Sequence, residues 1–209
     1  MEELYYCLIV RKQVERVFGG PEYGTKYSLD GACDVCGTGA EPIGPRIVTS
    51  FKAPKSPIFS ILGEEMLVNL ETAQELHMIG VECLAEVRGL KTKTLLPLME
   101  LRWEAVLPPF AEETRGYERD RPCPKCNRDG FFGIPREPYR LVYKNLSAEY
   151  RHKKVLATFE RFGNSRLRSP FKDSHFATPL PIVSGQVGEY LQTKAGKVVD
   201  LEPVAISWG

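Results

Sequence analysis

The sequence has no apolar run long enough to cross a bilayer, which takes about 20 residues, because charged residues, Gly or Pro interrupt every candidate segment. Its start, Met1-Glu2-Glu3 followed by a short apolar stretch, has neither the basic residues nor the length of a secretory signal. These two absences predict a cytoplasmic protein without a membrane partner.

Familiar signatures of catalysis are also missing. The sequence contains no phosphate-binding glycine loop, no nucleophile elbow and no His-Glu-x-x-His motif. Its three histidines, His77, His152 and His175, are not spaced as metal ligands, so surface or packing roles are favoured. We therefore expect no catalytic residues and a protein that binds, with an enzyme of unrecognised type as an alternative.

Charge is nearly balanced over the whole chain, with a net value of +1, but it is unevenly distributed. The stretch 140–172 contains nine Lys or Arg residues against two Glu. Such a stretch suits nucleic acid, an acidic protein partner, or simply solvent.

A strand–helix–strand pattern occurs twice. In the first copy, Asn69 caps a helix and Gly80 ends it; in the second, Ser184 and Gly196 take these places. The expected elements are a strand 66–69, helix 70–79 and strand 81–87, and then a strand 181–183, helix 185–194 and strand 198–205.

Other segments favour β structure. Strands are expected at 4–10, 27–30, 47–51 and 95–107. In the last of these, Met99, Leu101 and Trp103 alternate with Glu100 and Arg102, which predicts one buried and one solvated face.

The fold class is therefore α+β, mainly β, with a four-cysteine zinc-knuckle site and two short strand–helix–strand units. We expect a single domain over 1–209. Two lobes are the alternative: 1–130, holding the zinc knuckles and a folded insertion 38–122, and 131–209, holding the second strand–helix–strand unit.

Four of the six cysteines form two Cys-x-x-Cys pairs, Cys33 with Cys36 and Cys123 with Cys126. Cytosolic thiols stay reduced, so such pairs indicate a metal before disulfides. Four thiolates form a closed tetrahedral site around one structural zinc ion. The long interval between the pairs is acceptable because a folded insertion brings its own ends together.

Three other interpretations of the pairs stay open. A redox-active pair requires a following helix to lower the thiol pKa, and neither pair is followed by a helical pattern. An iron–sulfur cluster also binds to four cysteines, but its usual cysteine spacings differ from these. The third interpretation is that all four thiols are reduced and bind no metal. Cys7 and Cys83 lie in apolar runs and are expected to be core residues.

In the order of these features the chain resembles the double-CxxCG motif proteins, described as expanded paralogues in myxobacteria. The likeness rests on Cys33-x-x-Cys36-Gly37, a strand at 96–101, the second pair at Cys123 and Cys126, and the C-terminal strand–helix–strand at 181–204. It covers nearly the full length, although Asn127 stands where the second motif has glycine.

Some members of that family are described as immunity proteins that protect the producer from a toxin passed between cells. The resemblance implies a zinc-stabilised immunity protein that binds and neutralises a cognate toxin encoded by a neighbouring gene. The alternative is a zinc-ribbon-like nucleic-acid-binding protein that uses 140–172, with Tyr143, Tyr150 and Phe159 stacking on bases.

Overall fold

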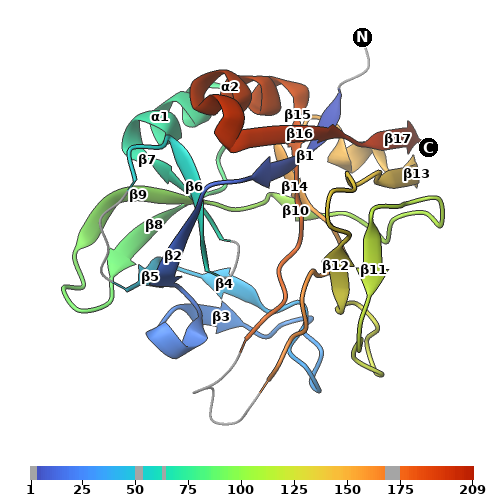
Figure 1. The fold of residues 1–209 in the computed structure, drawn as a ribbon, viewed down its shortest axis with the longest axis horizontal. Helices are drawn as coiled ribbons and strands as arrows, with labels where there is room; N and C mark the ends of the chain where they lie inside the picture. The colour runs from blue at the N-terminus through green and yellow to red at the C-terminus, as the bar shows by residue number, and fades with distance from the viewer. Residues whose placement is uncertain (1–3, 50–53, 63–64, 168–174) are drawn as a thin grey trace.

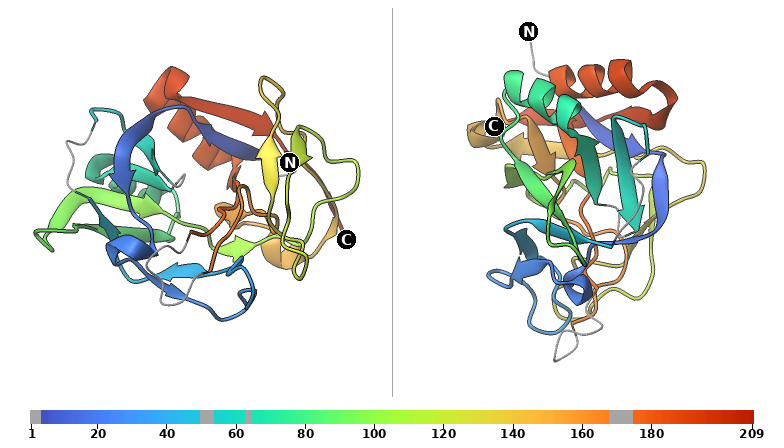
Figure 2. Two further views of the ribbon diagram at one scale, coloured as in Figure 1. Left: turned by 60° about the horizontal axis from the view of Figure 1, so that its bottom comes forward. Right: turned by 90° about the vertical axis from the view of Figure 1, so that its left-hand side faces the viewer.

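Asn69 and Ser184 each end a strand and begin a helix, as the sequence predicts. In the computed structural model, which describes residues 4–49, 54–62, 65–167 and 175–209, the Asn69 side chain accepts a hydrogen bond of 2.8 Å from the Thr72 amide. Helix α1 then spans Leu70–Met78, and Gly80 follows with a φ of 91°. Helix α2 spans Gly185–Ala195. The two helices lie side by side over one end of the molecule (Figures 1 and 2).

Two large sheets form the body of the protein. The N-terminal sheet has the order β2-β6-β7-β9-β8-β5, and the C-terminal sheet has the order β10-β14-β15-β1-β16. The first contains β2 Gln13–Phe18, β5 Arg46–Val48, β6 Ile58–Leu62, β7 Met66–Asn69, β8 Leu84–Gly89 and β9 Leu95–Leu101. The second contains β1 Tyr5–Val10, β10 Ala105–Val106, β14 Val155–Ala157, β15 Pro181–Ser184 and β16 Val199–Pro203.

Three two-stranded pairs complete the strands. They are β3 Lys26–Ser28 with β4 Glu41–Ile43, β11 Tyr117–Arg119 with β12 Phe131–Gly133, and β13 Val142–Leu146 with β17 Ala205–Trp208. Short 3-10 helices lie at η1 Pro21–Tyr23, η2 Ala148–Tyr150 and η3 Gly196–Val198. With two α-helices among these strands, the fold is mainly β and holds both strand–helix–strand units.

The two large sheets repeat one another over five strands. Over these five strands of each sheet, an edge strand runs parallel to its neighbour (β2 with β6, β10 with β14) and the other three pairings are antiparallel. The N-terminal sheet adds β5, which runs parallel to β8. The register repeats as well, because Asn69 pairs with Leu98 as Ser184 pairs with Tyr5. The repetition detected as strand–helix–strand therefore extends across both sheets.

The halves exchange their first strands. Strand β1 lies between β15 and β16 in the C-terminal sheet, and the chain then enters the N-terminal sheet as β2. Conversely, β9 lies between β7 and β8, and the chain continues into β10 of the other sheet. The lobes 1–130 and 131–209 stay a prediction about domains, but the C-terminal sheet crosses that boundary, because β1 and β10 lie in one sheet with β14, β15 and β16.

The largest core cluster lies between the helices and the two sheets. Leu76 of α1 and Leu191 of α2 are both fully buried in it, together with Val68 of β7 and Val183 of β15. Alternate residues of the same strands, such as Leu67 and Ile182, enter separate clusters on the opposite faces. Both faces of each sheet are thus covered, which explains the continuous apolar runs in these strands.

Some expected boundaries need correction. The strand expected at 81–87 is Leu84–Gly89, and the one expected at 95–107 ends at Leu101. Of the strand expected at 47–51, Arg46–Val48 forms, and residues 50 and 51 lie outside the described residues. The solvated face assigned to the strand at 95–107 was wrong at Glu100, which is 3% exposed because it pairs with the buried Arg46.

None of the helices in the described part of the chain combines the length and the apolar character that crossing a membrane requires.

Candidate metal centre

Each Cys-x-x-Cys pair lies in a turn at the end of a two-stranded antiparallel ribbon. Cys33 and Cys36 lie between β3 and β4, and Cys123 and Cys126 lie between β11 and β12. The two ribbons run in different directions, but their turns meet at the lower edge of the molecule in Figure 1, away from the helices. The segment between the pairs is folded and brings its ends together.

The two turns have the same backbone form. The amide of Gly37 donates to the Cys33 carbonyl at 2.7 Å, and the amide of Asn127 donates to the Cys123 carbonyl at 3.0 Å. Both Gly37 and Asn127 have left-handed backbones, with φ of 82° and 55°. Asn tolerates this conformation better than most side chains, so Asn127 preserves the turn although the motif glycine is missing.

The four sulfurs converge. All four lie within 4.8 Å of one another, with Cys33 Sγ 4.0 Å from Cys123 Sγ and Cys36 Sγ 3.7 Å from Cys126 Sγ. Four sulfurs placed tetrahedrally at about 2.3 Å from one zinc ion are separated by about 3.8 Å. The cluster therefore has the donors and the spacing to hold a metal ion such as zinc.

Charges and polar hydrogens surround the sulfurs. Lys125 pairs with Asp34 across the two turns at 2.8 Å, and its ammonium lies near enough to the sulfurs to offset part of a thiolate charge. The Thr38 hydroxyl, which is fully buried, lies 3.0 Å from Cys36 Sγ. Burial opposes ionisation of Cys33, but amide hydrogen bonds from Cys36 and Val35 lower the pKa of its thiol to about 7.

Asp129 fixes the second turn to the body of the protein. One of its carboxylate oxygens accepts from the Cys123 amide at 2.7 Å and the other accepts from the Ser165 amide at 2.9 Å, while the residue is only 2% exposed. Sequence reasoning missed this residue, because an isolated Asp after a cysteine pair carries no motif.

The remaining cysteines and the histidines stand apart from the cluster. Cys7 is fully buried, as expected of a core residue, and the partly buried Cys83 donates its thiol to the Arg102 carbonyl at 3.1 Å. All three histidines are exposed. Among the described residues, the four clustered cysteines form the one group of His, Cys, Asp or Glu side chains arranged to hold a metal.

Several positive charges of the stretch 140–172 are paired within the chain. Lys144 pairs with Glu113, and Arg161 pairs with Glu41 at 2.8 Å. Tyr143 is 1% exposed, so the expectation that it stacks on bases is wrong. Nucleic-acid binding by this stretch, part of which lies outside the described residues, stays a prediction.

A scan of the chain against protein-family models finds no match, and a search among curated proteins finds none either. The resemblance to the double-CxxCG motif proteins therefore stays a prediction that rests on the order of the motifs.

Proposed function

We propose that the chain is a cytoplasmic immunity protein in which one zinc ion, bound by Cys33, Cys36, Cys123 and Cys126, stabilises a surface that binds and neutralises a cognate toxin. The observation that carries the zinc part is the convergence of four sulfurs within 4.8 Å from two separate ribbons. Zinc accepts four thiolates in a closed site, and a closed site leaves no position for a substrate. The ion is therefore structural.

The protective role is supported by the resemblance in motif order. Its mechanism is stoichiometric binding: the protein occupies the toxin's effector domain and prevents its action. Zinc serves this role because it holds two ribbons from different halves of the chain in one fixed arrangement. A rigid surface loses less conformational entropy on binding than a mobile one.

A protection assay tests the role. Cells that express the toxin encoded beside this gene are given the wild-type protein, an empty vector, or the Cys33→Ser/Cys36→Ser variant. We expect survival with the wild type alone, and a one-to-one complex of toxin and wild-type protein on size-exclusion chromatography. Continued killing in cells that contain abundant folded wild-type protein would reject the role.

Metal analysis tests the zinc separately. Protein purified without added zinc is expected to contain one zinc per chain. If the metal is present and protection fails, the immunity role is wrong while the zinc site stands.

A further inference from the structure

A cavity of about 70 Å³ lies where the two large sheets meet. Its wall combines aromatic and charged side chains from both halves of the chain. The polar part of the wall includes Tyr27, Arg46, Glu65, Glu100 and Arg161, and Trp103 adds an indole ring. Since a water molecule occupies about 30 Å³ in the liquid, the space holds a molecule of a few heavy atoms.

Arg46 is already satisfied by the protein. Its guanidinium, 2% exposed, donates to Glu100, to Glu65 at 3.1 Å, to the Tyr27 hydroxyl at 2.7 Å and to the Gly19 carbonyl at 2.9 Å. Two carboxylates face this one cation. Each nitrogen of the Arg46 guanidinium therefore has an acceptor within the protein.

Arg161 is equally buried but far less satisfied. Its side chain is 3% exposed, its guanidinium donates to Glu41 at 2.8 Å, and its Nε has no hydrogen-bond partner among the described residues. Burial and the neighbouring charge of Arg128 lower the pKa of Arg161, and Glu41 opposes that shift. The carboxylates of Glu41 and of the buried Glu160 both act on this guanidinium, and its unused Nε–H favours a further hydrogen-bond acceptor.

A comparison of the two repeated sheets shows that the fold does not require a charged residue at the position of Glu100 in the cavity wall. Glu100 pairs with Leu67 in the N-terminal sheet, and Cys7 pairs with Ile182 at the corresponding place in the C-terminal sheet. Cys7 is neutral and fully buried. Buried ion pairs contribute little stability compared with apolar residues of similar volume, so the charges on one side alone indicate a task other than folding.

We propose that the cavity binds a small carboxylate, whose oxygens accept hydrogen bonds from the Arg161 guanidinium and whose apolar part lies against Trp103. Guanidinium and carboxylate are both planar and form paired, charge-assisted hydrogen bonds. The guanidinium carbon lies 5.8 Å from the centre of the Trp103 ring, so a molecule held by Arg161 contacts the indole. This site is independent of the zinc ion and of the toxin.

Tryptophan fluorescence tests the proposal, because the chain contains two tryptophans, Trp103 at the cavity and Trp208 in β17. A Trp208→Phe background leaves Trp103 as the single reporter. Acetate, propionate, benzoate and inorganic phosphate are titrated, with chloride at equal ionic strength as the blank. We expect a saturable change with at least one carboxylate and a weaker or absent change with phosphate.

Two variants in this background assign the site. Glu41→Gln removes the internal competitor and leaves Arg161 in place, so affinity for the carboxylate is expected to stay or to increase. Glu41→Gln/Arg161→Gln removes both charges of the ion pair together and is expected to weaken binding at least tenfold.

Thermal unfolding of the wild type provides a measurement that needs no variant, since a ligand that binds the folded state raises Tm in proportion to the logarithm of its concentration. The absence of saturation and of a Tm shift with all three carboxylates would overturn the proposal. So would tighter binding of phosphate than of any carboxylate, or unchanged affinity in the double variant.

Discussion

Cys33 and Cys123 occupy the same place in two corresponding ribbons, and their sulfurs lie 4.0 Å apart. Cys36 and Cys126 are matched in the same way at 3.7 Å. A metal bound here joins the two repeated halves at the end of the molecule opposite the helices. With a metal bound, the halves would be connected at one end through the four sulfurs; at the other they are connected by the exchanged strands and the packed helices.

Loss of a metal ligand should unfold or strongly destabilise the protein. Cys33→Ser and Cys123→Ser are each expected to lower the zinc content well below one ion per chain, because structural zinc contributes on the order of 10 kcal/mol to small sites. Metal analysis and circular dichroism measure both effects. Cys83→Ser is the matched control, since a serine hydroxyl can keep the hydrogen bond to the Arg102 carbonyl. Cooperative unfolding unchanged in the ligand variants would show that the site is peripheral.

The buried pair of Arg46 and Glu100 should matter more than an exposed pair. Glu100→Ala leaves a guanidinium that is 2% exposed with one carboxylate fewer, and we expect it to cost about 3–5 kcal/mol in the free energy of unfolding. Glu113→Ala breaks an exposed pair with Lys144, which water and salt screen, and should change the free energy of unfolding far less. Urea denaturation of the two variants distinguishes them, and equal costs would contradict this account.

Glu65 should make stability depend on pH. Burial raises the pKa of its carboxyl to about 7, although Arg46 opposes the shift. A carboxyl whose folded pKa exceeds its unfolded value, about 4.3, binds more protons when folded, so its contribution to stability falls as pH rises between these values.

Glu65→Gln removes that titration. Compared with the wild type, its free energy of unfolding should therefore improve from pH 5 to about pH 7 and level off above that, measured by denaturant unfolding in zinc-containing buffer. A difference between the two proteins that stays constant over this range would mean that Glu65 is ionised throughout. The comparison cancels any pH dependence of metal binding, because both proteins contain the same four cysteines.

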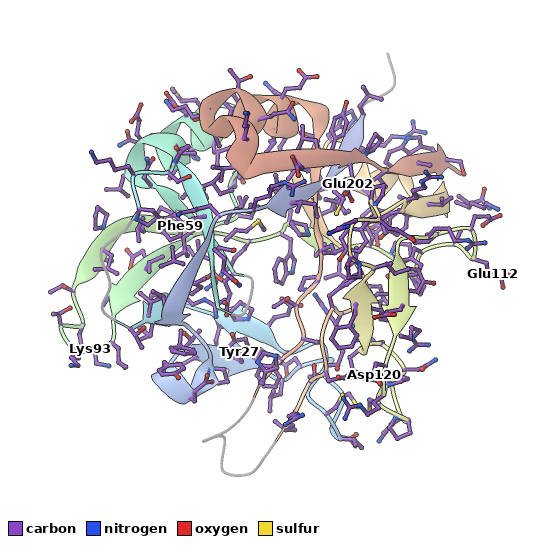
Figure 3. All side chains as sticks on the ribbon, viewed as in Figure 1. Tyr27, Phe59, Lys93, Glu112, Asp120 and Glu202 are labelled. Carbon is purple, nitrogen blue, oxygen red and sulfur yellow. The ribbon has the colours of Figure 1, made fainter. Side chains whose placement is uncertain are left out.

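The exchange of strands predicts that the chain survives a cut between its halves. The turn after β8 extends away from the body, with Lys93 at its tip (Figure 3), and the residues from Lys91 to Leu95 are exposed. A protease site inserted there and then cleaved should leave one folded particle on native size-exclusion chromatography, because β1 and β9 each remain inside the opposite sheet. A cut in the turn between Glu112 and Thr114 is the comparison, because it leaves β1 and β10 of the first fragment in the sheet of the second but places no strand of the second fragment in the sheet of the first. Separation of the halves under native conditions would contradict the topology.

The sequence alone determined the local elements and the ligands. Asn69 with Gly80, and Ser184 with Gly196, mark both helices because these signals are local, although only Asn69 caps its helix with a side-chain hydrogen bond and Ser184 does not. The two Cys-x-x-Cys turns are local for the same reason. Their convergence followed from chemistry, since two separate Cys-x-x-Cys pairs in one chain indicate a shared metal.

Only the tertiary structure decided which strand joins which sheet. Strand β1 would satisfy its hydrogen bonds equally well in either sheet, and its place between β15 and β16 depends on contacts with residues more than 170 positions away. The same holds for Glu100, whose alternation with apolar neighbours is typical of a solvated face. In the folded protein Glu100 is buried because it pairs with Arg46, which lies far from it in the sequence. A local sequence pattern cannot show a partner that only folding brings close.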